Sequence, residues 1–153
     1  MCMSGKGFSL GGTGIGVNLN SGTSQYCQYD ISMFSGISFS ISGFVSSGFM
    51  RFLVATAATT STIDDGTCTG TYGGTNGCED HYGLNFLPHT SAPVTVNVPF
   101  SLLAQEGWGL PVKWNAKQVL AIQWEVRVDY KNLFGPATPV DYSNICIDNI
   151  TFF

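Results

Sequence analysis

Short runs in which apolar and polar residues alternate recur along the chain, and they constrain its fold more than any other feature. In residues 36–44, isoleucine and phenylalanine alternate with serine. In residues 119–128, large apolar residues alternate with alanine, glutamine, glutamate and arginine. Because successive side chains of a β-strand point to opposite faces of a sheet, this period of two predicts strands with one buried face.

The same pattern predicts further strands along most of the chain. Well-marked strands are expected at 36–44, 49–56, 94–100, 119–128 and 144–153, and weaker ones at 6–10, 14–19 and 82–87. The strand at 49–56 is apolar on both faces, and Pro99 indicates that 94–100 lies at a sheet edge or ends there. The only helical candidate, 101–107, is long enough for one turn or a loop.

Many short strands separated by Gly, Ser and Asn turns predict an all-β sandwich or barrel. Glycine accounts for 19 of the 153 residues, which disfavours long helices because glycine weakens helix interiors. This length suffices for one hydrophobic core and is too short for two. With no linker or internal repeat in view, we expect a single domain spanning residues 1–153.

The charge content excludes several classes of partner. Charged residues make up 10% of the chain, the net charge is -4, and the six cations are scattered, so we expect no nucleic-acid partner. No apolar run approaches the ~20 residues of a membrane span, so we expect no membrane partner. The opening residues lack a signal peptide's apolar region, and the N-terminus is expected to be cut from a larger precursor. A neutral polar surface favours a neutral polar partner such as a polysaccharide.

The five cysteines predict disulfides rather than a zinc site, because none has zinc-ligand spacing. Cys68 and Cys78 enclose a loop of glycine and threonine, and a bond between them would hold a loop that has no core of its own. Two free thiols are the alternative, which suits a cytosolic protein. Cys27 is expected to pair with Cys146 or with Cys2, a choice that the sequence leaves open, and one cysteine remains over.

Motifs for catalysis are weak. The glycines of 11–16 do not match a dinucleotide-binding motif and favour a tight turn or close strand packing. His81 could belong to a hydrolytic triad, but a structural histidine or a hydrogen-bonding partner of a sugar fits it better. Glu125 shares its strand face with Gln123 and Arg127 and has no acidic partner there, as a glycosidase would need. We therefore expect no catalytic residue.

Calcium is a possible structural cofactor, because a calcium site needs several oxygen ligands. Asp148 in the last strand could supply one ligand, together with carbonyl groups of the N-terminal strand. Acidic residues on either side of the Cys68–Cys78 loop form a second candidate: Asp64, Asp65, Glu79 and Asp80. A solvated acidic loop is the alternative for this second group.

Aromatic and planar polar side chains are the candidates for binding sugar. Sugar rings lie with their apolar C–H faces on aromatic rings, and their hydroxyls form hydrogen bonds. Stacking is expected from Tyr72, Trp108 and Tyr82, and hydrogen bonds from His81, Arg51, Asn97 and Gln123. Trp108 could instead be a lid that closes the edge of the core, whereas Trp124 is expected in the core. The polar faces of the strands at 36–44, 94–100 and 119–128 would form one hydrogen-bonding floor if these strands share a sheet.

The segment YDISMFSGISFSISG at 29–43 resembles the signature YDxSxYxGIxFxxxG of carbohydrate-binding modules attached to secreted bacterial polysaccharide-degrading enzymes. CEDHYG at 78–83, the stretch 100–109 and IDNITFF at 147–153 follow in the same order. The resemblance implies a two-sheet antiparallel β-sandwich, a jelly roll of the galactose-binding type. It also implies glycan binding on the concave face or the loops, and a structural calcium where Asp148 matches the aspartate of the ID[DN] motif.

Together these features predict a non-catalytic carbohydrate-binding module. It would be a secreted monomer that binds plant-type polysaccharide of the β-glucan or xylan class and targets a covalently linked catalytic domain to it. Two alternatives stay open. A small jelly-roll glycosidase or lyase would need convergent acids or a cluster such as His81, Tyr82 and Arg51. A structural or adhesion domain would bind no sugar and would expose hydrophobic surface.

Overall fold

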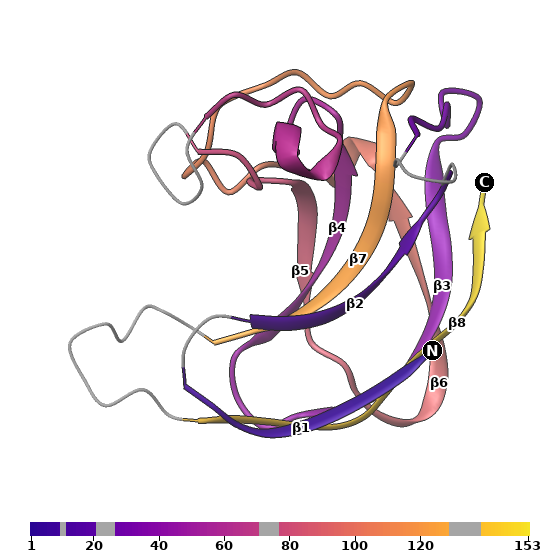
Figure 1. Cartoon of the computed structure of the whole chain (residues 1–153). Helices are drawn as coiled ribbons and strands as arrows, with labels where there is room; N and C mark the ends of the chain where they lie inside the picture. The colour runs from indigo at the N-terminus through magenta and orange to yellow at the C-terminus, as the bar shows by residue number, and fades with distance from the viewer. Residues whose placement is uncertain (10–11, 21–26, 71–76, 129–138) are drawn as a thin grey trace.

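The computed structural model describes residues 1–9, 12–20, 27–70, 77–128 and 139–153, in which eight strands and two single 3-10 turns are found (Figure 1). The strands are β1 (Cys2–Phe8), β2 (Gly12–Asn18), β3 (Gly36–Val45), β4 (Phe49–Thr56), β5 (Tyr82–Phe86), β6 (His89–Pro99), β7 (Val119–Arg127) and β8 (Val140–Phe152). The turns are η1 (Thr62–Asp64) and η2 (Phe100–Leu102). The described residues contain no helix that is long and apolar enough to cross a membrane.

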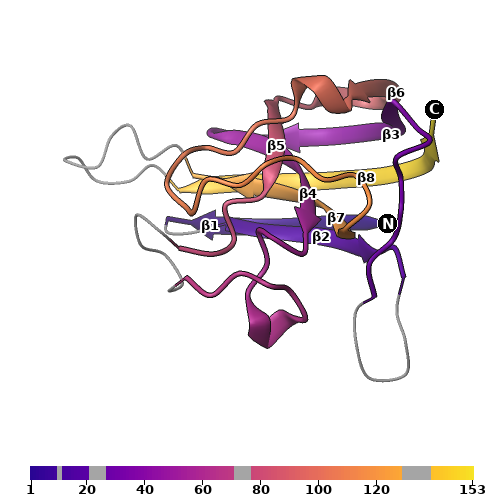
Figure 2. The ribbon, with the colours of Figure 1, turned by 90° about the horizontal axis from the view of Figure 1, so that it is seen from above.

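The strands form two four-stranded antiparallel sheets that pack face to face (Figures 1 and 2). The outer sheet has the order β1-β8-β3-β6, and the concave sheet has the order β2-β7-β4-β5. Because the chain crosses repeatedly from one sheet to the other, strands distant in sequence become neighbours. The prediction of an all-β, two-sheet antiparallel jelly roll is confirmed.

The core fills the space between the sheets. Trp124 of β7 is completely buried at its centre, with the rings of Phe39 and Phe52 at 5.1 and 5.4 Å between centroids. Phe39 meets Trp124 edge to face, an arrangement that aromatic pairs prefer. The prediction that Trp124 is a core residue is therefore confirmed.

The strand boundaries agree with the alternation pattern within two residues, apart from the starts of β1, β6 and β8. These three strands begin four or five residues earlier than predicted, at Cys2, His89 and Val140. Pro99 ends β6, which is an edge strand of the outer sheet, as the proline indicated. Of the helical candidate 101–107, only the first two residues belong to a helical turn, which is η2. Both faces of β4 are buried, one by the outer sheet and the other by loops that cover the concave sheet.

Two disulfides close the chain at separate places. Cys68 is bonded to Cys78, as predicted, with their Cα atoms 5.8 Å apart. Cys2 of β1 is bonded to Cys146 of β8, its partner across the antiparallel ladder. The expectation that Cys27 pairs with Cys146 or with Cys2 is wrong. The pairing of β1 with β8 brings the Cα atoms of Cys2 and Cys146 to 4.1 Å, and these two cysteines bond to each other. Cys27 is exposed and belongs to neither disulfide.

Candidate binding groove

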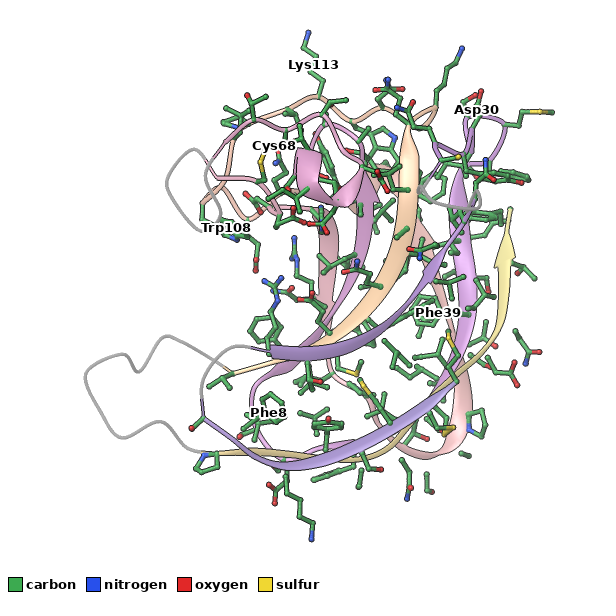
Figure 3. All side chains as sticks on the ribbon, viewed as in Figure 1. Phe8, Asp30, Phe39, Cys68, Trp108 and Lys113 are labelled. Carbon is green, nitrogen blue, oxygen red and sulfur yellow. A yellow bond between two sulfur atoms is a disulfide. The ribbon has the colours of Figure 1, made fainter. Side chains whose placement is uncertain are left out.

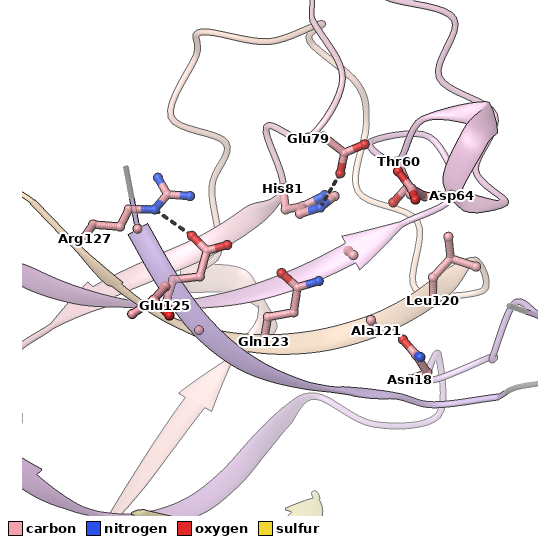
Figure 4. Close-up of a pocket in the computed structure, with 14 residues that line it drawn as sticks. Asn18, Thr60, Asp64, Glu79, His81, Leu120, Ala121, Gln123, Glu125 and Arg127 are labelled. Atoms are coloured by element: carbon pink, nitrogen blue, oxygen red, sulfur yellow. Dashed lines mark hydrogen bonds and ion pairs between the residues drawn. The ribbon is translucent and has the colours of Figure 1, made fainter. Parts of the chain in front are cut away.

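A groove of about 670 Å³ lies on the outward face of the concave sheet (Figure 4). Its floor is formed by β7 and β2, and its wall by residues of the segments 60–64 and 79–81. The side chains of the floor and wall include Asn18, Thr60, Asp64, Glu79, His81, Leu120, Ala121, Gln123, Glu125 and Arg127. The lining is therefore mainly polar, with both hydrogen-bond donors and acceptors.

The period of two in β7 places its polar side chains in the groove. Ile122, Trp124 and Val126 face the core, so Gln123 and Glu125 between them point outward. Figure 4 shows both side chains rising from β7 toward the wall. The floor therefore follows directly from the alternation in the sequence.

Glycines of β2 keep one side of this floor free of side chains. Gly12, Gly14 and Gly16 lie opposite Arg127, Glu125 and Gln123 of β7 in the ladder. A Cβ atom on Gly14 would lie 2.6 Å from the Trp124 carbonyl oxygen and 3.0 Å from Cγ of Glu125. Close strand packing is thus the role of these glycines, as their sequence suggested.

The wall contains a buried hydrogen-bonded chain through His81. Its Nδ1 atom lies 2.8 Å from the hydroxyl of Thr59, and its Nε2 atom lies 3.0 Å from Oε2 of Glu79. The other carboxylate oxygen of Glu79 accepts a hydrogen bond from the backbone N–H of Ser61 at 2.8 Å. Glu79 has a left-handed backbone with a φ of 77°, a conformation that this set of bonds holds in place.

These contacts change the acidity of Glu79. Burial by itself raises the pKa of a carboxyl group, but hydrogen bonds from His81 and Ser61 and the charge of His81 outweigh it. The pKa of Glu79 is therefore held below its ordinary value. The carboxylate stays ionised and ties the segment around Ser61 to the segment around His81.

This chain through His81 does not form a hydrolytic triad. Thr59 is 3% exposed, and its hydroxyl also bonds to the backbone N–H and carbonyl of Thr56, both at 3.1 Å. A nucleophile must reach the substrate, which this hydroxyl cannot do. His81 is accordingly a buried wall residue that hydrogen bonds hold in place.

Arginine and glutamate side chains form a network at one end of the groove. Arg127 donates from Nε to Oε2 of Glu125 at 2.8 Å, and its Nη1 donates to Oε2 of Glu106. Burial alone lowers the pKa of Arg127, but the two glutamates outweigh burial and raise it. Arg127 thus binds both carboxylates and holds Glu106 of the loop close to Glu125 of the floor.

Arg51 of β4 lies beneath this network and is 5% exposed. It donates to the side chain of Asn85 at 2.8 Å and to the carbonyl of Ala104 at 2.7 Å. Oε1 of Glu106 lies 3.8 Å from its Nη1. Desolvation lowers the pKa of Arg51, although the charge of Glu106 opposes this. Arg51 thus holds the loop after η2 onto the concave sheet.

The structure separates the predicted sugar-binding residues. Gln123 and His81 line the groove, and Arg51 is covered by the loop. Asn97 is exposed on β6 of the outer sheet, so β6 and β7 do not provide one shared polar floor. Trp108 is half-buried in the loop that contains Glu106.

Tyr82 belongs to the core, which corrects its assignment as a stacking residue. Its ring packs edge to face against Trp114 at 5.2 Å between centroids. Its hydroxyl donates to the carbonyl of Val112. The cluster of Tyr82 with His81 and Arg51 that a lyase would need is therefore not formed in the groove. Tyr72 lies outside the described residues.

Sequence reasoning did not identify Glu106, Asn18 and Thr60 as neighbours of the groove. Asn18 continues the outward face of the β2 glycines, so the register of this strand was a usable signal. Glu106 and Thr60 come from loops, whose course no periodic pattern predicts. Glu106 could have been noted only from its position two residues before Trp108.

Asp148 of β8 is the residue for which a calcium ligand role is predicted. Its exposed carboxylate accepts a hydrogen bond from the backbone N–H of Asn149 at 2.8 Å. Within the described ranges, no three acidic, histidine or cysteine side chains lie together as metal ligands would. In the second candidate group, Glu79 and Asp80 are engaged by protein donors. Calcium stays a prediction from the family resemblance.

Comparison with known proteins supports the fold and not a closer relationship. No family model matches the chain, and no curated protein matches it. A similar solved structure is the Family 11 Carbohydrate-Binding Module of cellulosomal cellulase Lic26A-Cel5E of Clostridium thermocellum, with a TM-score of 0.56 and 19% sequence identity. The match covers 97% of this chain and 71% of that chain. The likeness shows the jelly-roll fold that the sequence motifs implied.

Proposed function

We propose that the groove binds a polysaccharide and that the domain is a non-catalytic carbohydrate-binding module. The observation that carries this proposal is the row of outward-facing polar side chains on β7 and the adjacent wall, in a sandwich of this fold. Planar amide, carboxylate and guanidinium groups pair well with sugar hydroxyls, which both donate and accept hydrogen bonds. The open glycine side of β2 leaves room for a polymer.

In this mechanism Gln123 donates and accepts hydrogen bonds at the centre of the floor. Glu125 accepts from hydroxyl groups through the carboxylate oxygen that Arg127 does not use. Trp108 adds a ring on which a sugar can stack. Affinity is expected to be modest, because each sugar hydroxyl exchanges a bond with water for a bond with protein at little net gain.

The ligand class that we propose is plant-type β-glycan, of the β-glucan or xylan class. The domain would act as a monomer and concentrate a covalently linked catalytic domain on this polymer. Two disulfides fit a secreted protein, because such bonds persist in oxidising compartments. The sequence resemblance to modules of secreted polysaccharide-degrading enzymes supports the same assignment.

Affinity electrophoresis through gels that contain xylan, mixed-linkage β-glucan, xyloglucan, mannan or pectin tests this proposal. We expect at least one neutral β-glycan to retard the parent, and Gln123→Ala to abolish most of the retardation. Asn97→Ala is the matched control, because it removes an exposed amide from the opposite sheet.

The other outcomes distinguish the remaining functions. Equal retardation of Gln123→Ala and the parent would place binding elsewhere on the molecule. Failure of every polymer to retard the parent would favour a structural or adhesion domain, a function that the 93% exposed Met33 and the exposed Phe34 also fit. Shortening of the polymer during incubation would indicate an enzyme.

A further inference from the structure

Asp80 organises the loop that carries Trp108. Asp80 is 2% exposed, and its carboxylate accepts three backbone hydrogen bonds from this loop. Glu106 N–H donates at 2.9 Å, Gly107 N–H at 2.8 Å and Gly109 N–H at 3.0 Å. A Cβ atom on Gly109 would overlap with the side chain of Asp80, so the loop approaches Asp80 as closely as a backbone can.

Gln105 fixes the same loop from a second side. Its Nε2 atom donates to the carbonyl of Asp80 at 2.8 Å and to that of Leu110 at 3.0 Å. Its Oε1 atom accepts from the backbone N–H of Val112 at 3.0 Å. Gly107 supplies a φ of 89°, which lets the chain reverse. The backbone on both sides of Trp108 is therefore held by specific bonds.

This support is not explained by packing of Trp108 in the core. Trp108 is absent from the hydrophobic core that the described residues form, whereas Trp114 and Trp124 take part in it. The alternative that Trp108 is a lid on the core therefore has no support here. Figure 3 shows Trp108 on the open side of the molecule, at the edge of the loops above the concave sheet.

One carboxylate connects Trp108 to the groove. Oε2 of Glu106 accepts a hydrogen bond from the indole Nε1 of Trp108 at 3.2 Å. The same oxygen pairs with Arg127, whose side chain lines the groove. Asp80 fixes the backbone of this loop, and Glu106 fixes the ring against the end of the floor.

We propose that Asp80 is a positioning residue that holds Trp108 at the Arg127 end of the groove, where the indole stacks on a sugar ring of the bound chain. This inference rests on the proposed function. A ring that is already held in its binding position loses little conformational freedom when the ligand arrives, so the contact contributes more of its energy to affinity.

A double-mutant cycle tests the proposal, with the soluble polymer that retards the parent most as ligand. Trp108→Ala and Asp80→Asn should each weaken binding about threefold to tenfold, the range of one aromatic contact. The double variant should bind no more weakly than Trp108→Ala, because Asp80 acts only through Trp108. Additive losses would overturn the proposal.

Acrylamide quenching of tryptophan fluorescence provides a second readout that does not need a ligand. Asp80→Asn should increase quenching, and the increase should vanish in the Trp108→Ala background, where only Trp114 and Trp124 emit. An unchanged quenching curve in folded Asp80→Asn would contradict the proposal. If the parent binds no polymer, the proposed function fails, but this measurement still decides whether Asp80 holds the Trp108 ring.

A second pair of variants applies if Asp80→Asn does not fold. Glu106→Ala removes the acceptor of the Trp108 indole and leaves the three backbone bonds to Asp80 in place. It should weaken binding and should be non-additive with Trp108→Ala, whereas Glu106→Gln, which keeps an acceptor oxygen, should recover part of the affinity. Parent-like binding by Glu106→Ala would show that the Trp108 ring needs no positioning.

Discussion

The outward faces of the two sheets both come from the alternation of polar and apolar residues, but their surroundings differ. In the outer sheet, Ser38 lies in register between Asn97 and Thr151, and the side chains of Asn97 and Thr151 are exposed. In the concave sheet, Gln123 and Glu125 occupy the corresponding outward positions. Both faces come from alternation, and the groove with its wall lies over the second one.

The difference arises from loops rather than from strands. The segment of η1 and the segment after the Cys68–Cys78 disulfide stand over the concave sheet, and Glu79 binds one to the other through Ser61. Figure 2 shows the segment with η1 projecting from the side of the sandwich that carries β2 and β7. A polar strand face becomes a groove only where such segments are fixed above it.

The largest difference between the two regions should appear when the disulfide of the outer sheet is removed. Cys2→Ser with Cys146→Ser opens a loop of 144 residues, so the chain-entropy model predicts a loss of about 5 kcal/mol in unfolding free energy. Urea unfolding measures this loss. Affinity for the polymer should stay unchanged in the folded fraction, because this bond lies in the other sheet; a loss of affinity would contradict the separation of the two regions.

Removing the Cys68–Cys78 disulfide should reduce stability less, and affinity more, than removing Cys2–Cys146. Cys68→Ser with Cys78→Ser opens a loop of only 10 residues, and the same model predicts a loss of about 2.5 kcal/mol. Binding should weaken severalfold, since Glu79 and His81 of the wall follow Cys78 directly. Isothermal titration measures the affinity of both double variants for the polymer. If the two affinities are equal, the wall does not need the Cys68–Cys78 bond.

The strands and the floor could be predicted from the sequence, but the wall could not. The period of two in residues 119–128 located Gln123 in the floor and Trp124 in the core, because the geometry of a strand fixes both directions. Tyr82 was misassigned although the same alternation was present: it shares the apolar face of β5 with Leu84 and Phe86, whereas Gly83 and Asn85 lie on the other face. The contacts of Asp80 and Glu106 depend on how irregular loops fold back, which no local pattern encodes.

Glycines in the two edge strands offer a finer comparison. Gly14→Ala in β2 would place a Cβ 2.6 Å from a carbonyl of β7, and overpacking of this kind costs about 1–3 kcal/mol. Gly7→Ala in β1 meets no neighbour but has a φ of 74°, which costs about 1–2 kcal/mol. Thermal unfolding should show both losses, whereas only Gly14→Ala should reduce affinity, by pushing β2 away from β7 within the floor. Reduced affinity in Gly7→Ala would contradict this distinction.

The smallest expected effect is a dependence of stability on pH, which should arise in the wall and not in the sheets that support it. Because the folded-state pKa of Glu79 lies below its ordinary value of 4.5, its ionised form stabilises the protein above about that pH. The contribution is lost as the pH falls from 4.5 through the lower folded-state pKa, when the carboxyl group takes up a proton and releases Ser61 and His81.

Glu79→Gln should therefore be less stable than the parent at neutral pH, and the difference should shrink as the pH falls below 4.5. Urea unfolding at a series of pH values measures this convergence. Affinity of the parent should fall over the same range, because protonation loosens the wall while the floor stays in the sheet. If the two stability curves run parallel down to pH 3, the bonds of Glu79 do not hold the wall, and the groove depends on its strands alone.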